Sequence, residues 1–327
     1  MKVLHLSYHL SCKADLEYVF DELGHEHEFL TFSQPDGQHY NMTHDRANYY
    51  WRKYKDYFHK FDCIVTSDTA PLSRIFLQNN WKKKLIIWVC NRFDYSHQPC
   101  VDFPDEGYYK LIRDIKNRPN VEIVGYTPFE NHYAKTIRNL PIGSQVIKPT
   151  GCLPDTYVPP PPTNLPRKDE TFLVGPYHND NVMLNLKEIL QNKGIRVHNG
   201  RYEGPLDLAE FKGVVHIPYA WSNFAVFEGF KFAVPFFLPS LTFLENLRQG
   251  KAFFWSPPYR RDALELSEWY LPAHKDLFIY FDSWEDLQFR IQAFGPSEAR
   301  AHKNKLLKFA SQHATNTLKS WKNLLVP

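Results

Sequence analysis

Residues 213–240 carry the clearest chemical pattern in the sequence. They read GVVHIPYAWSNFAVFEGFKFAVPFFLPS, an apolar strand followed by a polar turn, a short helix and a second apolar strand. Ser222 and Asn223 stand at the expected helix start, where free backbone N–H groups and the helix dipole favour an anion. Glu228 follows within the helix, where its carboxylate could accept both hydroxyls of a ribose. The pattern indicates a nucleotide-diphosphate site, or else a capped helix with a solvated acid.

Two acids and one histidine near the ends of predicted strands could supply a catalytic base. Asp94 lies in CNRFDYSH, Asp68 directly follows the run CIVTS, and His9 follows the first predicted strand. The carboxyl ends of parallel strands form the ligand-binding edge of an open sheet. We rank Asp94 and Asp68 together and His9 after them, because a lone histidine is more often structural. Asp68 could instead cap a helix, and Arg92 could either pair with Asp94 or meet phosphate.

The loop NGRYEG at residues 199–204 offers a third group of candidates. It follows the predicted strand IRVHN, whose carboxyl end opens onto the same edge as the segment 213–240. Arg201 could pair with a nucleotide base, and Tyr202 could stack on it. An ordinary surface turn is the alternative interpretation.

Alternating strands and helices must position these residues in the first half of the chain. Nearly continuous apolar runs predict strands, and helical periodicity between them predicts helices. The predicted strands are residues 2–8, 27–32, 62–68, 84–90, 121–125 and 146–151, and the predicted helices are residues 14–23, about 45–60, 71–79, 106–117 and 128–138. This order favours a parallel α/β sheet covered by helices on both faces.

A proline-rich connector divides the chain, with six prolines between residues 154 and 166. Proline resists helices and central strands, so this segment predicts an interdomain hinge. The alternation then restarts, with predicted strands at 171–175 and 195–199, helices at 181–193 and 206–211, the segment 213–240, and a last helix at 297–324. We predict one α/β domain at residues 1–149 and a second at 150–304, with a helix of about 305–327 that returns to the first.

Three segments resemble the GT-B class of glycosyltransferases, and within it the group that includes glycosyltransferase family 4. They are VIKPTG (146–151), TFLVGPYHNDN (171–181) and SNFAVFEGFKFAVPFFLPS (222–240). The resemblance implies two Rossmann-like domains with parallel sheets that face a central cleft. It also implies that the C-terminal domain holds a nucleotide-sugar donor, with Gly175 in the donor loop, and that the N-terminal domain binds the acceptor.

The sequence departs from this family in two places. Retaining members usually carry two glutamates separated by seven residues, and Ala220 occupies the first position if Glu228 is the second. Members usually also carry Arg and Lys after the first strand of the second domain, and VGPYHNDN contains neither. His178, Lys148 or Arg201 could supply that charge, and the choice between retention and inversion stays open.

Composition and motifs exclude several other classes. With 39 Lys and Arg against 36 Asp and Glu, the net charge of +3 gives no argument for nucleic-acid binding. The common nucleotide-binding P-loop, dehydrogenase, metalloprotease and hydrolase motifs are absent, as is an Asp-x-Asp metal motif, so we expect no metal cofactor. Five cysteines without zinc spacing, no signal peptide and no apolar run of 18 residues predict a cytoplasmic protein, with peripheral membrane contact left open.

The sequence therefore predicts an enzyme that moves a hexosyl or pentosyl group from a nucleotide-diphosphate sugar to a glycan or other hydroxyl acceptor. Two alternatives remain. A noncatalytic nucleotide- or glycan-binding protein of the same fold would keep Glu228 and need no base. A sugar-nucleotide epimerase would need acids and histidines that converge on the sugar from both domains.

Overall fold

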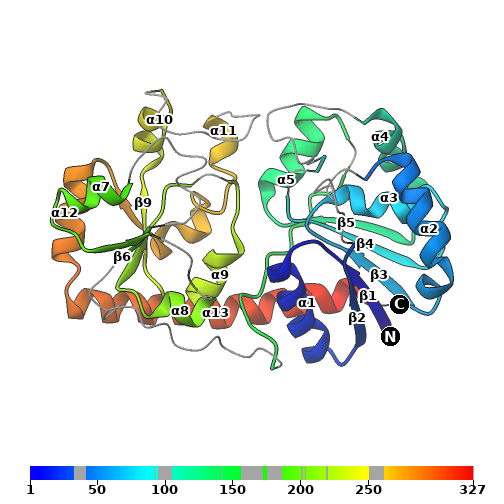
Figure 1. Ribbon diagram of the computed structural model, residues 1–327, viewed down its shortest axis with the longest axis horizontal. Helices are drawn as coiled ribbons and strands as arrows, with labels where there is room; N and C mark the ends of the chain where they lie inside the picture. The colour runs from blue at the N-terminus through cyan, green and yellow to red at the C-terminus, as the bar shows by residue number, and fades with distance from the viewer. Residues whose placement is uncertain are drawn as a thin grey trace. The chain divides into compact units, whose positions relative to one another are not determined.

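The computed structural model describes residues 1–32, 42–91, 93–94, 105–140, 142–155, 172–174, 186–199, 202, 204–218, 220–249 and 261–326. The chain divides into two units (Figure 1). Unit 1 comprises Met1–Asp155 and Asn316–Pro327, and unit 2 comprises Thr156–Thr315. Most of the predicted connector, from residue 156 to 171, lies outside the described residues.

Unit 1 contains a five-stranded parallel sheet in the order β2-β1-β3-β4-β5. The strands are β1 (Lys2–Leu6), β2 (Glu26–Leu30), β3 (Cys63–Thr66), β4 (Lys84–Val89) and β5 (Val121–Gly125). Every residue of β3 is buried, and so is every residue of β4 after its first. The continuous apolar runs in the sequence therefore reflect strands that are covered on both faces.

The helices of unit 1 begin at polar caps. They are α1 (Leu10–Glu22), α2 (His44–Phe58), α3 (Arg74–Leu77), α4 (Glu106–Arg113) and α5 (Pro128–His132), with 3₁₀ turns at Ala70–Ser73 and Asp114–Asn117 and a π-helical turn at Tyr133–Ile137. The side chains of Thr43, Asp105 and Thr127 accept hydrogen bonds from backbone N–H groups in the first turns of α2, α4 and α5. In Figure 1, α1 and the end of the last helix lie on one face of the sheet, and α2 and α3 lie on the other.

The strand expected at 146–151 is reduced to one parallel bridge between Val146 and Gly125. The rest of this segment is a turn held by a buried acid of α1, because Asp15 Oδ1 accepts hydrogen bonds from Thr150 N at 2.8 Å, Thr150 Oγ1 at 2.7 Å and Gly151 N at 3.1 Å. Gly151 has a φ of +71°, which glycine adopts without steric cost. The sequence did not predict this role of Asp15, because Thr150 and Gly151 are far from it along the chain.

Unit 2 repeats the topology of unit 1 in a second parallel sheet, ordered β10-β9-β8-β6-β7. Its strands are β6 (Phe172–Val174), β7 (Val197–Asn199), β8 (Gly213–Val215), β9 (Phe236–Pro239) and β10 (Ile279–Phe281). Its helices are α7 (Leu186–Gln191), α8 (Pro205–Ala209), α9 (Phe224–Lys231), α10 (Leu241–Gln249), α11 (Arg261–Leu264) and α12 (Trp284–Ala293), with a 3₁₀ turn at Pro272–Leu277. The sequence did not predict β10 and α10 to α12, because a three-residue strand and short helices leave little periodicity.

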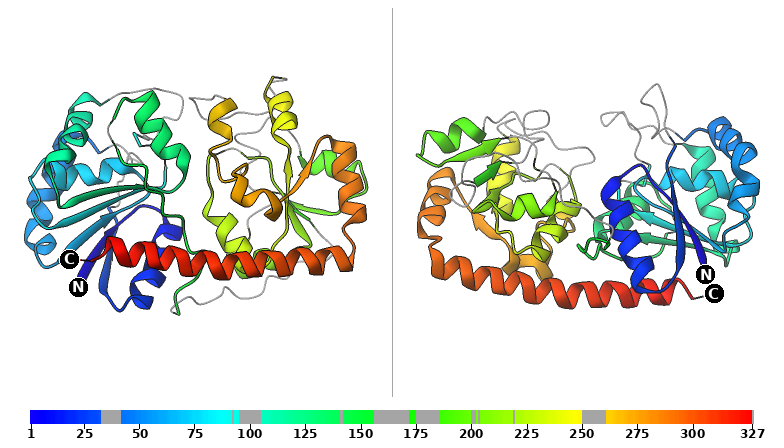
Figure 2. Two further views of the ribbon diagram at one scale, coloured as in Figure 1. Left: turned by 180° about the vertical axis from the view of Figure 1, so that it is seen from behind. Right: turned by 60° about the horizontal axis from the view of Figure 1, so that its bottom comes forward.

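The last helix, α13 (Pro296–Leu324), is 29 residues long and appears as one continuous helix in Figure 2. In unit 2, its Phe309 ring lies 5.5 Å from that of Phe230. In unit 1, its Trp321 ring meets Trp88 edge-to-face at 5.4 Å. Both chain ends lie in unit 1, where Lys84 Nζ donates a hydrogen bond to the carbonyl of Val326.

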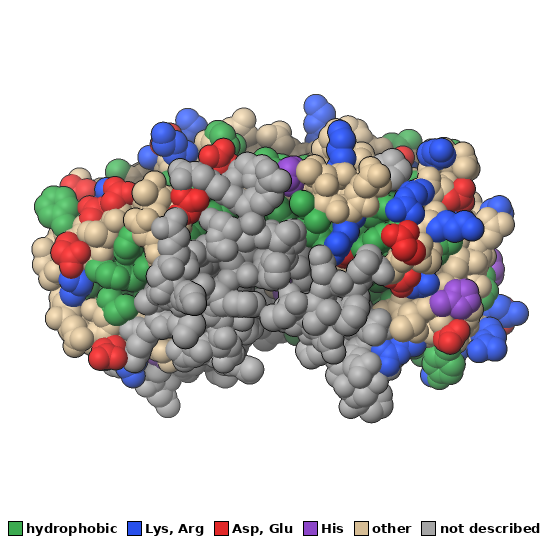
Figure 3. Space-filling view, turned by 90° about the horizontal axis from the view of Figure 1, so that it is seen from above, with side chains coloured by type: hydrophobic (Ala, Val, Ile, Leu, Met, Phe, Trp, Pro, Cys, Tyr) green, Lys and Arg blue, Asp and Glu red, His purple; other side chains and the backbone are tan. Residues whose placement is uncertain are grey.

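Charged side chains of both signs are interspersed over the described surface that Figure 3 shows. Large exposed apolar side chains in the described ranges include Leu10, Tyr49 and Phe289. Across the described helices, none combines the length and the apolar character that a membrane crossing requires.

Candidate functional site

The strand order of each sheet defines where a ligand would bind. In a doubly wound sheet of the order 2-1-3-4-5, successive strands are added on one side of the first strand and then on the other. This switch point lies between the first and third strands, and ligands bind outside the carboxyl ends of these two strands. In unit 1 this switch point lies between β1 and β3, which are followed by His9 and Asp68. In unit 2 it lies between β6 and β8, and the chain after β8 leads into α9.

His9 is the N-cap residue of α1. Its Nδ1 accepts a hydrogen bond from Ser11 N at 3.2 Å, and its own backbone N–H donates to Ser7 Oγ at 3.1 Å. The side chain is exposed at the carboxyl edge of the sheet. An Nδ1 that accepts a hydrogen bond places the proton of a neutral imidazole on Nε2, so this tautomer follows from the cap.

Asp68 is buried and conformationally constrained. Only 3% of its surface is exposed, and its φ of +68° lies in the left-handed region, which few residues other than glycine adopt. Its carbonyl accepts a hydrogen bond from Asn91 N at 3.0 Å, which joins the ends of β3 and β4. Burial raises the pKa of Asp68 to about 7, and within the described chain its Oδ2 has no hydrogen-bond partner. A carboxyl group with a pKa near neutrality can accept a proton under physiological conditions.

Two cysteine thiols lie near the carboxylate of Asp68. The four described cysteines are free, and two of them, Cys12 of α1 and Cys90 after β4, interact electrostatically with Asp68. Burial favours the neutral form of Cys12, but hydrogen bonds with Cys90 and His9 outweigh it and lower the pKa of the Cys12 thiol. The sequence gave no sign that Cys90 would meet Cys12. Cys100 lies outside the described residues.

Asp94 is held by three side chains. Tyr133 Oη donates a hydrogen bond to its Oδ1 at 2.7 Å, Arg138 Nε lies 2.6 Å from its Oδ2, and Tyr109 Oη donates to the same Oδ2. Its side chain is 7% exposed. Both carboxylate oxygens are therefore engaged within unit 1, so the geometry favours a structural anchor at Asp94. Arg92, which the sequence offered as a partner of Asp94 or of phosphate, lies outside the described residues.

In unit 2 the predicted donor-binding turn precedes α9. Asn223 is the N-cap, and its side chain accepts a hydrogen bond from Ala225 N at 2.9 Å. Ser222 is partly exposed beside it, and Glu228 is partly exposed in the second half of α9. Gly229 lets α9 approach β9 closely, because a Cβ there would lie 2.5 Å from Cε2 of Phe236.

An aromatic segment that the sequence did not single out braces this turn. Trp269 Nε1 donates a hydrogen bond to the carbonyl of Ala220 at 2.8 Å, and Glu268 N donates to that of Trp221 at 3.0 Å. The Trp269 ring also lies 4.5 Å from that of His216, the residue after β8. The position where the family resemblance implied a glutamate is thus fixed by its backbone.

A second helix begins near α9 at the carboxyl edge of unit 2. Ser240 follows β9, and its Oγ accepts a hydrogen bond from Phe243 N at 3.2 Å in the first turn of α10. Its backbone N–H donates to the carbonyl of Phe281 at 2.8 Å, which ties the turn to β10. The sequence placed Ser240 at the end of the strand and gave it no role.

The remaining donor-binding candidates are divided between unit 2, unit 1 and the residues that the structure does not describe. Tyr202 is partly exposed in unit 2, and Lys148 is partly exposed but belongs to unit 1. Gly175, His178 and Arg201 lie outside the described residues. Within the described ranges, no three His, Cys, Asp or Glu side chains are placed to hold a metal ion.

Comparison with solved structures shows a GT-B glycosyltransferase-like fold, as the sequence predicted. HepE from Anabaena, in complex with UDP and glucose, is 10% identical with a TM-score of 0.55. UGT89C1 of Arabidopsis thaliana, complexed with UDP, is 12% identical at 0.53, and the glycosyltransferase SnogD from Streptomyces nogalater is 11% identical at 0.51. Each comparison covers 99% of both chains. No family model and no curated protein sequence matches the chain.

Proposed function

We propose that this protein is a glycosyltransferase that moves a sugar from a nucleotide-diphosphate sugar to a hydroxyl acceptor. The GT-B fold supports this assignment at the level of architecture, and two of the similar structures hold UDP. Because a fold alone does not define a function, the site must carry the argument. The observation that carries it is the pair of His9 and Asp68 at the switch point of unit 1, with one carboxylate oxygen of Asp68 unpartnered among the described residues.

The donor is assigned to unit 2. In this proposal Ser222, Asn223 and the start of α9 receive the diphosphate, and Glu228 receives the ribose hydroxyls. Gly175 belongs to the loop that the resemblance assigns to the donor, and Tyr202 stacks on the base. Positive charge for the diphosphate would come from His178, Lys148 or Arg201.

The acceptor hydroxyl is assigned to the carboxyl edge of unit 1. The acceptor oxygen attacks the anomeric carbon as the bond from that carbon to the diphosphate breaks. The hydroxyl proton passes to Asp68. His9 is exposed at the same edge and contacts the acceptor hydroxyl from the solvent side. The nucleoside diphosphate departs with the electron pair of the broken bond. Asp94 keeps the surrounding loop and helix ends in place through Tyr133 and Arg138.

Donor binding is tested by the melting temperature of the protein with UDP, GDP, ADP or TDP. A ligand that binds only the folded state raises this temperature, so we expect one nucleotide to stabilise the protein and Glu228→Ala to reduce its effect. Glu265→Ala, which removes an exposed acid of unit 2, is the matched control. A failure of all four nucleotides to stabilise the wild-type protein would reject the proposed donor class.

Transfer is proposed to need no metal ion, because helix N-termini and positive side chains offset the charge of the diphosphate. Activity should therefore survive treatment with EDTA at constant ionic strength. The measurement is the rate at which the nucleoside diphosphate is released in the presence of acceptor. A loss of activity that Mg²⁺ or Mn²⁺ restores would contradict this part of the proposal.

The same incubations separate the two alternatives. A noncatalytic binding protein would bind the nucleotide but release none from the sugar nucleotide. An epimerase would convert one sugar nucleotide into another, visible by NMR, with no release of nucleoside diphosphate. The capped start of α9 and the acid of raised pKa at the carboxyl edge of unit 1 are compatible with transfer and with an epimerase, so release of the nucleoside diphosphate decides between them.

A further inference from the structure

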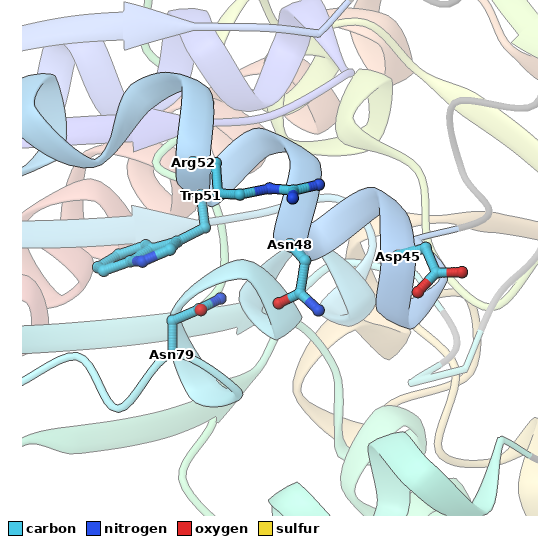
Figure 4. A pocket seen from close by; sticks show the side chains of 5 residues that line it. All are labelled: Asp45, Asn48, Trp51, Arg52 and Asn79. Atoms are coloured by element: carbon cyan, nitrogen blue, oxygen red, sulfur yellow. The ribbon is translucent and has the colours of Figure 1, made fainter.

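A cavity of about 450 Å³ lies on unit 1 between α2 and the chain that follows α3. Its volume falls within the range of sites for small ligands. Figure 4 shows the residues that line it: Asp45, Asn48, Trp51, Arg52 and Asn79. None of them belongs to the edge formed by His9 and Asp68, so the proposed transfer reaction leaves this cavity unexplained.

Trp51 forms one wall of the cavity and is held by aromatic neighbours. Its ring lies 5.9 Å from His59, 6.2 Å from Phe58 and 6.2 Å from Trp81, where the two indoles meet edge-to-face. The residue remains partly exposed. A fixed aromatic ring at the surface offers an apolar platform at little cost in conformational entropy.

The other walls carry planar polar groups. Asn48 Oδ1 accepts a hydrogen bond from Gln78 Nε2 at 2.6 Å, and Asn79 Nδ2 donates to the carbonyl of Ile75 at 2.9 Å, so both amides are fixed in orientation. Figure 4 shows Trp51 and Asn48 extending from α2 toward Asn79.

Two charged side chains complete the cavity. Asp45 and Arg52 are exposed, and in the part of the chain that the structure describes neither side chain has an ion-pair or hydrogen-bond partner. They lie two turns apart on α2, with Asn48 between them, so one side of the helix presents an acceptor, an amide and a donor.

We propose that this cavity is an accessory carbohydrate-binding site that holds a sugar residue of the acceptor glycan. A sugar ring has an apolar C–H face that packs on an indole and a rim of hydroxyls that each donate and accept hydrogen bonds. The carboxylate, the two amides and the guanidinium match that rim. A phosphate ligand fits less well because Asp45 would repel it, and an apolar ligand would cover the charged groups of Asp45 and Arg52 without offering them a hydrogen-bond partner. The ligand class rests on the proposed function, whereas the existence of the site does not.

The test uses the full-length protein on a printed array of oligosaccharides, followed by calorimetric titration of the glycan that is retained most strongly. We expect Arg52→Ala to weaken the affinity about five- to tenfold and Trp51→Phe about two- to tenfold. Lys110→Ala, which removes an exposed positive charge from α4 of the same unit, should leave it unchanged. The melting temperature of each variant checks that the fold is intact, and Trp51→Phe keeps an aromatic ring for the neighbouring cluster.

The outcome is independent of the donor experiment. Retention of an oligosaccharide that both cavity variants weaken supports the accessory site, even if no nucleotide stabilises the protein. The proposal is overturned if the wild-type protein retains no oligosaccharide, or if it binds the best glycan no more tightly than Arg52→Ala and Trp51→Phe. Nucleotide stabilisation without glycan retention would overturn the accessory site and leave the proposed donor class intact.

Discussion

At the scale of single residues, two aspartates that look alike in the sequence lie in opposite environments. Asp94 meets Arg138, Tyr109 and Tyr133, so its charge is neutralised and its oxygens are occupied. Asp68 is buried in a left-handed backbone conformation, and burial outweighs its interactions with His9 and Asn91, so the pKa of its carboxyl group is raised. A buried charge that its neighbours compensate only in part is costly, and such groups concentrate at functional sites.

This contrast predicts opposite effects of two Asp→Asn variants on stability. The pKa of Asp68 rises from 3.8 to about 7 on folding. Between these two pH values the folded protein becomes progressively less stable as pH rises, because the unfolded chain ionises Asp68 more readily than the folded protein does. Above about pH 7 this loss of stability is constant. Asp68→Asn should therefore stabilise the protein by about 1 to 3 kcal/mol at pH 8, with the gain vanishing near pH 4. Asparagine also tolerates the left-handed conformation. Asp94→Asn should destabilise by about 1 to 3 kcal/mol because it weakens the ion pair with Arg138.

Urea unfolding of both variants from pH 4 to pH 8 measures these differences, and release of the nucleoside diphosphate measures activity. Asp68→Asn should abolish transfer while the protein becomes more stable. If it instead transfers sugar at the wild-type rate, Asp68 is not the proton acceptor, whatever its effect on stability.

At the scale of elements, the turns after parallel strands hold the candidate groups. The sequence located α9 because its polar cap and its apolar flanking strands are local signals, and Asn223 does cap it. It placed the first helix at 14–23, whereas α1 begins at Leu10, because His9 provides a cap that the helical periodicity does not reveal. The residue at which a helix begins therefore depends on its capping side chain, whereas the presence of a helix or strand is predicted by its apolar pattern.

Gly229→Ala tests whether the packing of α9 on β9 positions Glu228. The added Cβ would clash with the ring of Phe236, so we expect a loss of about 1 to 3 kcal/mol in the free energy of unfolding and weaker nucleotide binding. Gly143→Ala, at a site with no atom closer than 4.0 Å to the new Cβ, serves as the control. Calorimetry and nucleotide titration measure the two effects. Wild-type stability in Gly229→Ala would show that the contact is not close in solution.

At the scale of the whole molecule, a single chain builds two parallel sheets of the same strand order, and its last helix contributes to the cores of both units. Trp321 of α13 is fully buried in unit 1 against Trp88, which itself donates a hydrogen bond to the carbonyl of Ile147 at 2.7 Å. Unit 1 therefore lacks part of its core until the end of the chain is in place.

Trp321→Ala should selectively destabilise unit 1. Removing a large buried ring leaves a cavity, and we expect a loss of about 3 to 5 kcal/mol. Hydrogen exchange followed by mass spectrometry should show faster exchange in β4 and β5 than in β8 and β9. Lys322→Ala, an exposed neighbour on the same helix, is the control, and equal acceleration in both sheets would argue against a local role for Trp321.

The sequence by itself determined the alternation of strands and helices, the two α/β units and the GT-B resemblance, because apolar periodicity, prolines and helix caps are local. It also located the turn from Ser222 to Glu228. Only the tertiary structure decided that Asp94 is bound by Arg138, that Cys12 and Cys90 adjoin Asp68, and that Trp269 fixes the carbonyl of Ala220. The physical reason is that a side chain's charge state and free hydrogen-bonding capacity depend on neighbours that are distant in the chain and meet only when the sheet forms.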